Sequence, residues 1–250
     1  MNKQFISSTR FLMLLVVVMG FSVASLCARE KTTFVIVHGA WGGSWSFKQT
    51  DYILSDAGYI VYRPSLTGLG ERHHLSNTEI GLTTHITDVV NTILFDDLHD
   101  VILIGHSYGG MVITGVADSI PERIKQLVYL DAFVPNDGES VIDLRASGGL
   151  ESNVRSGFII PTWVQNTDII PRDVPQSLKT FTEPVSYKNK SAMLLPATYI
   201  LTVDEGKKAE EDSFYDSAER AKERGWDIIE MTADHNPQMT MPNKLAEVLI

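Results

Sequence analysis

One serine stands in a sequence context that could make it a nucleophile. Ser107 is the centre of Gly105-His106-Ser107-Tyr108-Gly109, which follows an apolar run and precedes a helix-like start. A strand that turns directly into a helix strains its middle residue, and the residues two before and two after it must be small. Gly105 and Gly109 meet that need. The pattern predicts a Ser107 hydroxyl presented at the carboxyl end of a sheet, ready for acyl transfer.

A serine hydroxyl needs a base to take its proton, and His235 is the histidine best placed to do so. It follows the last predicted strand by a short loop, so it should project from the same sheet edge as Ser107. His38 and His106 are expected to be structural. Surface or supporting positions are expected for the other histidines: His73, His74, His85 and His99.

Short apolar runs alternate with helix-like segments, which predicts an α/β fold with a mostly parallel central sheet and helices on both faces. The predicted strands are 33–37, 59–62, 101–104, 127–130, 198–203 and 227–231. The predicted helices are 47–57, 83–97, 110–119, 214–224 and 242–249. Residues 135–196 contain six prolines and no clear strand, so a small helical cap is expected there, inserted into a single domain that spans 29–250.

The tetrahedral oxyanion of acyl transfer needs two backbone N–H groups aimed at it. One should come from Tyr108, the residue after the nucleophile, and the other from the loop after the first strand, where Ala40 is the best placed donor. Aromatic residues near these positions are candidates to contact a hydrophobic substrate: Trp41, Phe158 and Trp163.

These motifs resemble the plant methylesterase and hydroxynitrile lyase family of α/β-hydrolases, and bacterial esterases related to it. The resemblance rests on HGAWGGSW at 38–45, GHSYGG at 105–110, ADH at 233–235 and VDEG at 203–206. The stretch PSLTGLGER at 64–72 is similar to the bacterial branch. The resemblance covers most of the chain from Thr33 onward and implies a Ser-His-acid triad.

The acid of such a triad follows the serine and precedes the histidine in the chain. Asp204, directly after the strand 198–203, fits that order, and its loop looks like the family's acid loop. Asp204 is therefore the expected partner of His235. Glu205, its neighbour, and Asp131, which follows the strand 127–130, are the alternatives.

Two positions favour ester hydrolysis over cyanohydrin cleavage. Hydroxynitrile lyases of this family carry a threonine where this chain has Gly39 and a lysine where it has Asn236. The expected activity is hydrolysis of a small or medium hydrophobic ester through an acyl-enzyme. Lyase-like, C–C bond or lactone chemistry, and a non-catalytic protein that binds a small ligand, remain as alternatives.

The N-terminus has the layout of a secretory signal peptide over residues 1–28. Lys3 and Arg10 precede the apolar run 11–19, and small residues lead to a cleavage site after Cys27 or Ala28. A secreted or periplasmic protein, without a stable membrane anchor, is therefore expected. The net charge of −10 argues against a nucleic-acid partner. The sequence shows neither metal-ligand spacing nor a dinucleotide motif, so no cofactor is expected.

Overall fold

The computed structural model describes residues 31–145 and 153–250. The predicted signal peptide, residues 1–28, lies outside the described residues. Among the helices that are described, none has the length and apolar character needed to cross a bilayer.

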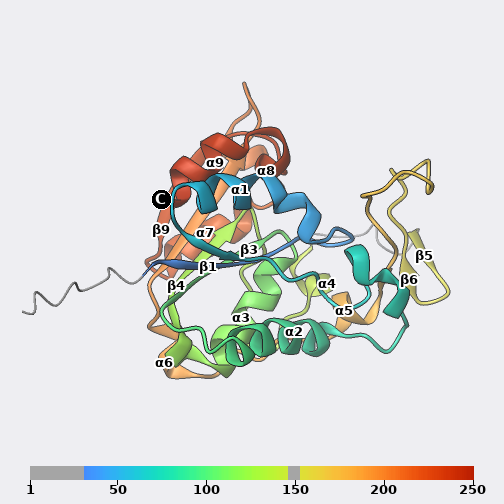
Figure 1. The fold of residues 1–250 in the computed structure, drawn as a ribbon, viewed down its shortest axis with the longest axis horizontal. Coiled ribbons are helices and arrows are strands. Elements are labelled where there is room, and N and C mark those ends of the chain that lie inside the picture. The colour runs from blue at the N-terminus through green and yellow to red at the C-terminus, as the bar shows by residue number, and fades with distance from the viewer. Residues whose placement is uncertain (1–30, 146–152) are drawn as a thin grey trace, which may run out of the picture. The chain divides into compact units, whose positions relative to one another are not determined.

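Six parallel strands form the central sheet, as the alternating apolar runs predicted (Figure 1). Their order across the sheet is β2-β1-β3-β4-β8-β9. The strands are β1 (Thr33–Val37), β2 (Ile60–Tyr62), β3 (Val101–His106), β4 (Ile124–Leu130), β8 (Ala197–Val203) and β9 (Asp227–Thr232). The chain moves outward from β1 to β2 and then returns to place β3 on the other side of β1. Loops that leave the carboxyl ends of β1 and β3 diverge at this reversal, where open α/β sheets bind their ligands.

Helices cover both faces of this sheet, and the strands are apolar on both sides for that reason. Along β1, Val35 and Val37 enter the core beneath the first group of helices, whereas Phe34 and Ile36 enter the core of the opposite face. The first group is α2 (Leu82–Phe95), α3 (Gly109–Ser119) and α7 (Tyr215–Glu223). The opposite face carries α1 (Lys48–Asp56) and α9 (Pro242–Leu249), and α8 (Pro237–Thr240) packs beside them (Figure 1). Short 3-10 helices occur at Ser44–Phe47, Gly70–Leu75, Pro121–Arg123 and Ala209–Glu211.

The segment 135–196 departs from the predicted helical cap. Its described part contains a three-stranded antiparallel sheet made of β5 (Val154–Arg155), β6 (Phe158–Ile159) and β7 (Gln176–Ser177). Three helices of four residues each accompany it: α4 (Val141–Leu144), α5 (Lys179–Thr182) and α6 (Lys190–Met193). Pro184 and Pro196 follow α5 and α6 by two and three residues and prevent these helices from continuing, because a proline inside a helix removes a hydrogen bond and clashes with the preceding turn.

Candidate active site

Ser107 lies in the strained turn that the glycine pattern predicted. Its φ angle is 54°, and its N–H donates to Leu130 O at 3.1 Å. A Cβ atom at Gly105 would lie 2.6 Å from the carbonyl oxygen of Gly109, and one at Gly109 would lie 2.6 Å from that of Val37. Both distances are far below van der Waals contact, so the flanking glycines allow the close approach of backbones that holds the serine in this conformation.

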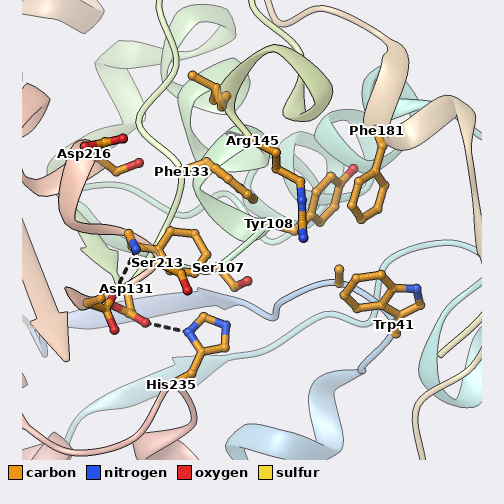
Figure 2. A pocket seen from close by; sticks show the side chains of 15 residues that line it. Trp41, Ser107, Tyr108, Asp131, Phe133, Arg145, Phe181, Ser213, Asp216 and His235 are labelled. Carbon is orange, nitrogen blue, oxygen red and sulfur yellow. Dashed lines mark hydrogen bonds and ion pairs between the residues drawn. The ribbon is translucent and has the colours of Figure 1, made fainter. Parts of the chain in front are cut away.

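His235 comes to the same place from the loop after β9. Ser107 and His235 both line a cavity of about 540 Å³ at the carboxyl end of the sheet (Figure 2). The imidazole Nδ1 lies 2.5 Å from Oδ2 of Asp131. A carboxylate only accepts hydrogen bonds, so Nδ1 carries the proton and Nε2 is left with a free lone pair. The imidazole is therefore in the tautomer that a general base requires.

Asp131 follows β4 directly and is fully buried, with 0% of its surface exposed. Its φ angle of 43° is unusual for a residue other than glycine. Its N–H donates to Ile200 O at 2.8 Å, and its Oδ1 accepts the N–H of Thr202 at 3.2 Å. Neighbouring β8 thus holds both the backbone and the side chain of Asp131, and the second carboxylate oxygen is directed at His235.

Asp204, the expected partner of His235, lies elsewhere. Its carboxylate is exposed and pairs with Lys207 Nζ at 2.7 Å, and Glu205 beside it is exposed as well. The reason is the point at which each aspartate leaves its strand. The chain after β8 runs outward into solvent at Asp204, whereas the left-handed turn at Asp131 keeps that carboxylate under the His235 loop. In the structure, the carboxylate that contacts His235 is therefore that of Asp131 and not that of Asp204.

Two rings contact the imidazole of His235. The Phe214 ring lies 5.0 Å from it, with an interplanar angle of 5°, and the His106 ring lies 4.7 Å from it, with an angle of 37°. Asp212 Oδ1 accepts the N–H of Phe214 at 2.8 Å, which fixes the segment that carries the stacked ring. Burial and the neighbouring His235 hold the pKa of His106 well below its usual value, so His106 is neutral.

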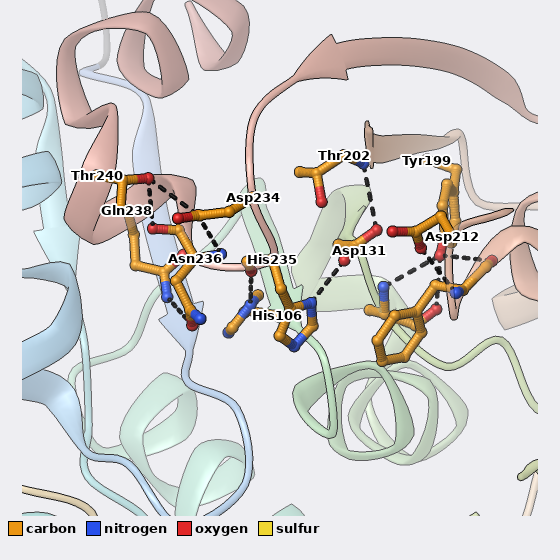
Figure 3. A network of polar contacts seen from close by, with 12 residues as sticks. His106, Asp131, Tyr199, Thr202, Asp212, Asp234, His235, Asn236, Gln238 and Thr240 are labelled. Carbon is orange, nitrogen blue, oxygen red and sulfur yellow. Dashed lines mark hydrogen bonds and ion pairs between the residues drawn. The ribbon is translucent and has the colours of Figure 1, made fainter. Parts of the chain in front are cut away.

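Polar contacts hold the His235 loop in place (Figure 3). His106 Nε2 donates to the backbone carbonyl of His235 at 2.8 Å, which is the structural role expected for this histidine. Asp234 Oδ1 accepts the N–H of Asn236 at 2.8 Å and the hydroxyl of Thr240 at 2.9 Å. The loop is thus tied both to the elbow that carries Ser107 and to the helix that follows it.

The predicted oxyanion donors, Ala40 and Tyr108, both line the cavity with Ser107. Their backbone N–H groups make no hydrogen bond to other groups in the described ranges 31–145 and 153–250. The next N–H along the first loop, that of Trp41, is occupied instead, because it donates to Gln176 Oε1 at 2.7 Å. Two N–H groups beside the nucleophile therefore remain able to receive a developing negative charge.

Two further histidines support this region from below. Burial lowers the pKa of His38 to about 4, with Nδ1 donating to Gly39 O at 2.8 Å and Nε2 accepting the N–H of Leu66 at 3.1 Å. Burial likewise lowers the pKa of His85 to about 4; its Nε2 donates to Thr67 O at 3.0 Å and its Nδ1 accepts the hydroxyl of Tyr108 at 2.9 Å. His85 is thus a buried support for Tyr108, whereas His73, His74 and His99 are exposed.

The predicted substrate contacts are placed unequally. Trp41 lines the 540 Å³ cavity, and Trp163 lines an adjoining one. Phe158 lies in β6 and lines neither cavity. The sequence analysis missed several residues that the fold brings to Ser107: Phe133, Leu144, Arg145, Phe181, Asp212 and Phe214. Phe133 lies three residues after the end of β4, and this position near a strand end was the one available signal.

Comparison with known proteins agrees with this architecture. A family model described as the alpha/beta hydrolase family matches residues 34–248. The carbendazim hydrolyzing esterase of Nocardioides sp. (strain SG-4G) is 38% identical over 239 residues, which cover 86% of this chain and 97% of that protein. Methylesterase 1 of Arabidopsis thaliana is 30% identical over 114 residues, 45% of this chain and 43% of that protein.

A solved structure extends the likeness to three dimensions. An extracellular alpha/beta-hydrolase from a Paenibacillus species, described as sharing homology with tobacco salicylic acid binding protein 2, superposes with a TM-score of 0.71 at 27% identity. The match covers 87% of this chain and 97% of that one. From the parallel sheet, the serine elbow and these relatives together, we conclude that the chain belongs to the alpha/beta hydrolase family.

Proposed function

We propose that this ester hydrolase acts through a triad of Ser107, His235 and Asp131. The observation that supports it most is the chain of contacts at one sheet edge. Ser107 sits in a strained turn and faces the same cavity as His235, whose Nδ1 is bonded to the buried Asp131 at 2.5 Å. Strain and a buried carboxylate cost stability, and such features gather at catalytic sites.

In the first half of the reaction, Ser107 Oγ attacks the ester carbonyl while His235 Nε2 takes its proton. The N–H groups of Ala40 and Tyr108 stabilise the tetrahedral oxyanion, and Asp131 stabilises the imidazolium. His235 then gives the proton to the leaving alcohol, and the acyl group stays on Ser107.

In the second half, a water molecule takes the place of the alcohol. His235 removes a proton from the water, whose oxygen attacks the acyl carbon. His235 then returns the proton to Ser107 Oγ as the bond between Oγ and the acyl carbon breaks, which releases the acid and restores the Ser107 hydroxyl. The Phe214 ring stacked on His235 favours the positive charge that the imidazole carries in both halves, because an aromatic face attracts a cation.

Cyanohydrin cleavage fits the site less well. A Cβ atom at Gly39, where lyases of the resembling family carry threonine, would lie 2.9 Å from His106 Nδ1 and 3.1 Å from Ser107 Cβ. A threonine would therefore displace the serine or the histidine below it. Asn236 also follows His235 where those lyases have a lysine. Both observations favour ester hydrolysis.

The direct test is the Ser107→Ala variant, assayed with an aryl ester such as 4-nitrophenyl butyrate. We expect kcat to fall by at least about 10³-fold, because nucleophile and base act as a unit. Thermal unfolding of the variant checks that it is folded. Labelling of the wild-type protein by a fluorophosphonate, followed by measurement of ester turnover, separates an enzyme from a binding protein. A Ser107→Ala variant with near-normal activity would rule out the proposal.

We also propose that residues 1–28 direct export of the protein and are then removed by cleavage. The charged, apolar and small-residue order of that segment supports this proposal. Mass spectrometry of the N-terminus of the protein recovered outside the cytoplasm should begin at Ala28 or Arg29. Recovery of the uncleaved chain inside the cell alone would contradict export.

A further inference from the structure

Two cavities, rather than one, meet at Ser107. The first has a volume of about 540 Å³ and the second about 480 Å³. Four residues line both of them: Ala40, Trp41, Ser107 and His235. These four include the proposed nucleophile, its base and one oxyanion donor. A carbonyl group placed on Ser107 therefore lies where the two cavities join, with room on either side of it.

Each cavity has its own apolar residues, beside polar ones such as Arg145 and Asp216 in the first and Asp173 and Gln238 in the second. The first, which we call the Phe133 chamber, is lined by Tyr108, Phe133, Leu144, Phe181 and Phe214. The second, the Trp163 chamber, is lined by Trp45, Trp163 and Met239. Both are large enough for an aromatic ring, and their linings offer the flat apolar surfaces that bind one.

Trp41 forms the wall between the two chambers. Its indole packs edge-on against Trp163 of one chamber, at 5.0 Å and 89°, and in a tilted arrangement against Phe181 of the other, at 5.5 Å and 42°. Figure 2 shows the indole beside Phe181 at the edge of the Phe133 chamber. The wall is thus a single side chain in contact with both linings.

The backbone of Trp41 is held in an unfavourable conformation to keep this wall in place. Its φ angle is 61°, in the left-handed region that a bulky residue rarely adopts. Three hydrogen bonds to the segment 135–196 fix it. Its N–H donates to Gln176 Oε1 at 2.7 Å, its Nε1 donates to Ile159 O at 3.1 Å, and its carbonyl accepts the N–H of Val174 at 2.9 Å. A strained backbone that several hydrogen bonds hold in place is typical of positions on which function depends.

We infer that the substrate is an ester with a bulky apolar, preferably aromatic, group on each side of the ester bond, one for each chamber. This inference rests on the proposed function, since it places the ester carbonyl on Ser107. A methyl ester or an acetate fills one chamber and leaves the other to water. An ester with two rings replaces water in both chambers, and part of the binding energy gained in this way stabilises the transition state.

A matched set of four esters tests the inference: methyl acetate, benzyl acetate, methyl phenylacetate and benzyl phenylacetate. Methanol and benzyl alcohol have similar acidities, so differences in kcat/KM reflect binding rather than leaving-group chemistry. We expect benzyl phenylacetate to exceed each one-ring ester by at least about tenfold, since a single methylene in an apolar pocket already changes kcat/KM about tenfold or more. A two-ring ester no better than the better one-ring ester would overturn the inference.

Variants of each chamber then show whether the two rings bind in different places. Trp163 lines only the Trp163 chamber and Phe133 lines only the Phe133 chamber, so Trp163→Ala and Phe133→Leu each alter the lining of one chamber directly. Each variant should reduce the gain in kcat/KM that one ring gives by at least about fivefold and leave the gain from the other ring unchanged. The two variants should act on opposite rings. Leu144→Ala, at a half-buried position of the Phe133 chamber, replaces Phe133→Leu if the latter is unstable.

The same measurements separate this inference from the proposed function. All rates are taken as the part of the turnover that Ser107→Ala removes. If no ester shows turnover of that kind, the proposed triad fails. If turnover depends on Ser107 but both chamber variants reduce the benefit of the same ring, the triad stands and the two-chamber inference is wrong.

Discussion

The Phe214 ring stacks on the imidazole of His235, with the ring centres 5.0 Å apart and the planes 5° from parallel. An aromatic face attracts a cation by about 0.5–2 kcal/mol, and His235 gains positive charge in the proposed transition states. Asp212 and Phe133 hold Phe214 in place. Asp212 Oδ1 accepts the N–H of Phe214 at 2.8 Å, and the Phe133 ring makes an edge contact with the Phe214 ring at 4.9 Å between ring centres.

Phe214→Leu should therefore lower kcat by about 2-fold to 30-fold, the factor that corresponds to the lost cation attraction. Phe214→Tyr, which keeps the ring, should retain most of the wild-type kcat. The measurement is kcat and KM for one aryl ester, together with thermal unfolding of both variants. An equal loss in the leucine and tyrosine variants would show that the stacked ring does not act on the charge of His235.

Gln176 connects the segment 135–196 to the loop that carries the oxyanion donor. It is buried, accepts the Trp41 N–H at 2.7 Å and donates to Thr180 Oγ1 at 2.8 Å. Gln176→Met keeps the side chain's length but leaves the Trp41 N–H without its acceptor. We expect kcat to fall about tenfold, because the loop that holds Ala40 is less well fixed. Gln126→Met is the matched control. Gln126 lies near the amino end of β4, and this variant should keep the wild-type kcat. Equal kcat values for the two variants would contradict this role of Gln176.

Some of the site was predictable from sequence because its signals are local. The glycines around Ser107 act within a single turn, and His235 needed only a strand before it and a short loop. The choice between Asp131 and Asp204 had no such signal, since each directly follows an apolar strand. It is decided by a left-handed φ angle at Asp131 and by hydrogen bonds from β8, which is distant in the chain.

The segment 135–196 was the least predictable part of the fold. Its three strands have two residues each, too few to show an alternating pattern. Phe158 illustrates the consequence. Its apolar character indicated a contact with substrate, whereas in the structure its backbone pairs with Arg155 and Ser177 in the small sheet and it lines neither cavity beside Ser107. Gln176, on the same sheet, was missed because nothing in the sequence connects it with Trp41.

The buried histidines make stability depend on pH. The pKa values of His38 and His85 are lowered to about 4 in the native protein, against 6.5 for the free side chain. Between pH 6.5 and pH 4 the unfolded chain therefore binds protons that the native protein does not, and stability falls as the pH falls. The loss is roughly 3 kcal/mol for each histidine over this range.

Chemical denaturation at pH 7 and pH 4 measures this loss. We expect the free energy of unfolding to be several kcal/mol lower at pH 4. In His85→Gln, whose side chain does not titrate, the difference between the two pH values should be roughly 3 kcal/mol smaller. His73→Gln, a change at an exposed position, should leave the difference as it is in the wild type. Equal stabilities of the wild-type protein at the two pH values would contradict the burial of neutral histidines.

In the proposed triad Asp131, and not Asp204, orients His235 for catalysis. The most direct measurement is kcat of Asp131→Asn beside that of Asp204→Asn, with an aryl ester as substrate. We expect Asp131→Asn to lose about 10³-fold to 10⁴-fold, because an amide presents the wrong partner to Nδ1 of His235. Asp204→Asn removes only an exposed ion pair with Lys207 and should stay within about twofold of the wild type. The reverse order, with Asp204→Asn inactive and Asp131→Asn active, would contradict the account.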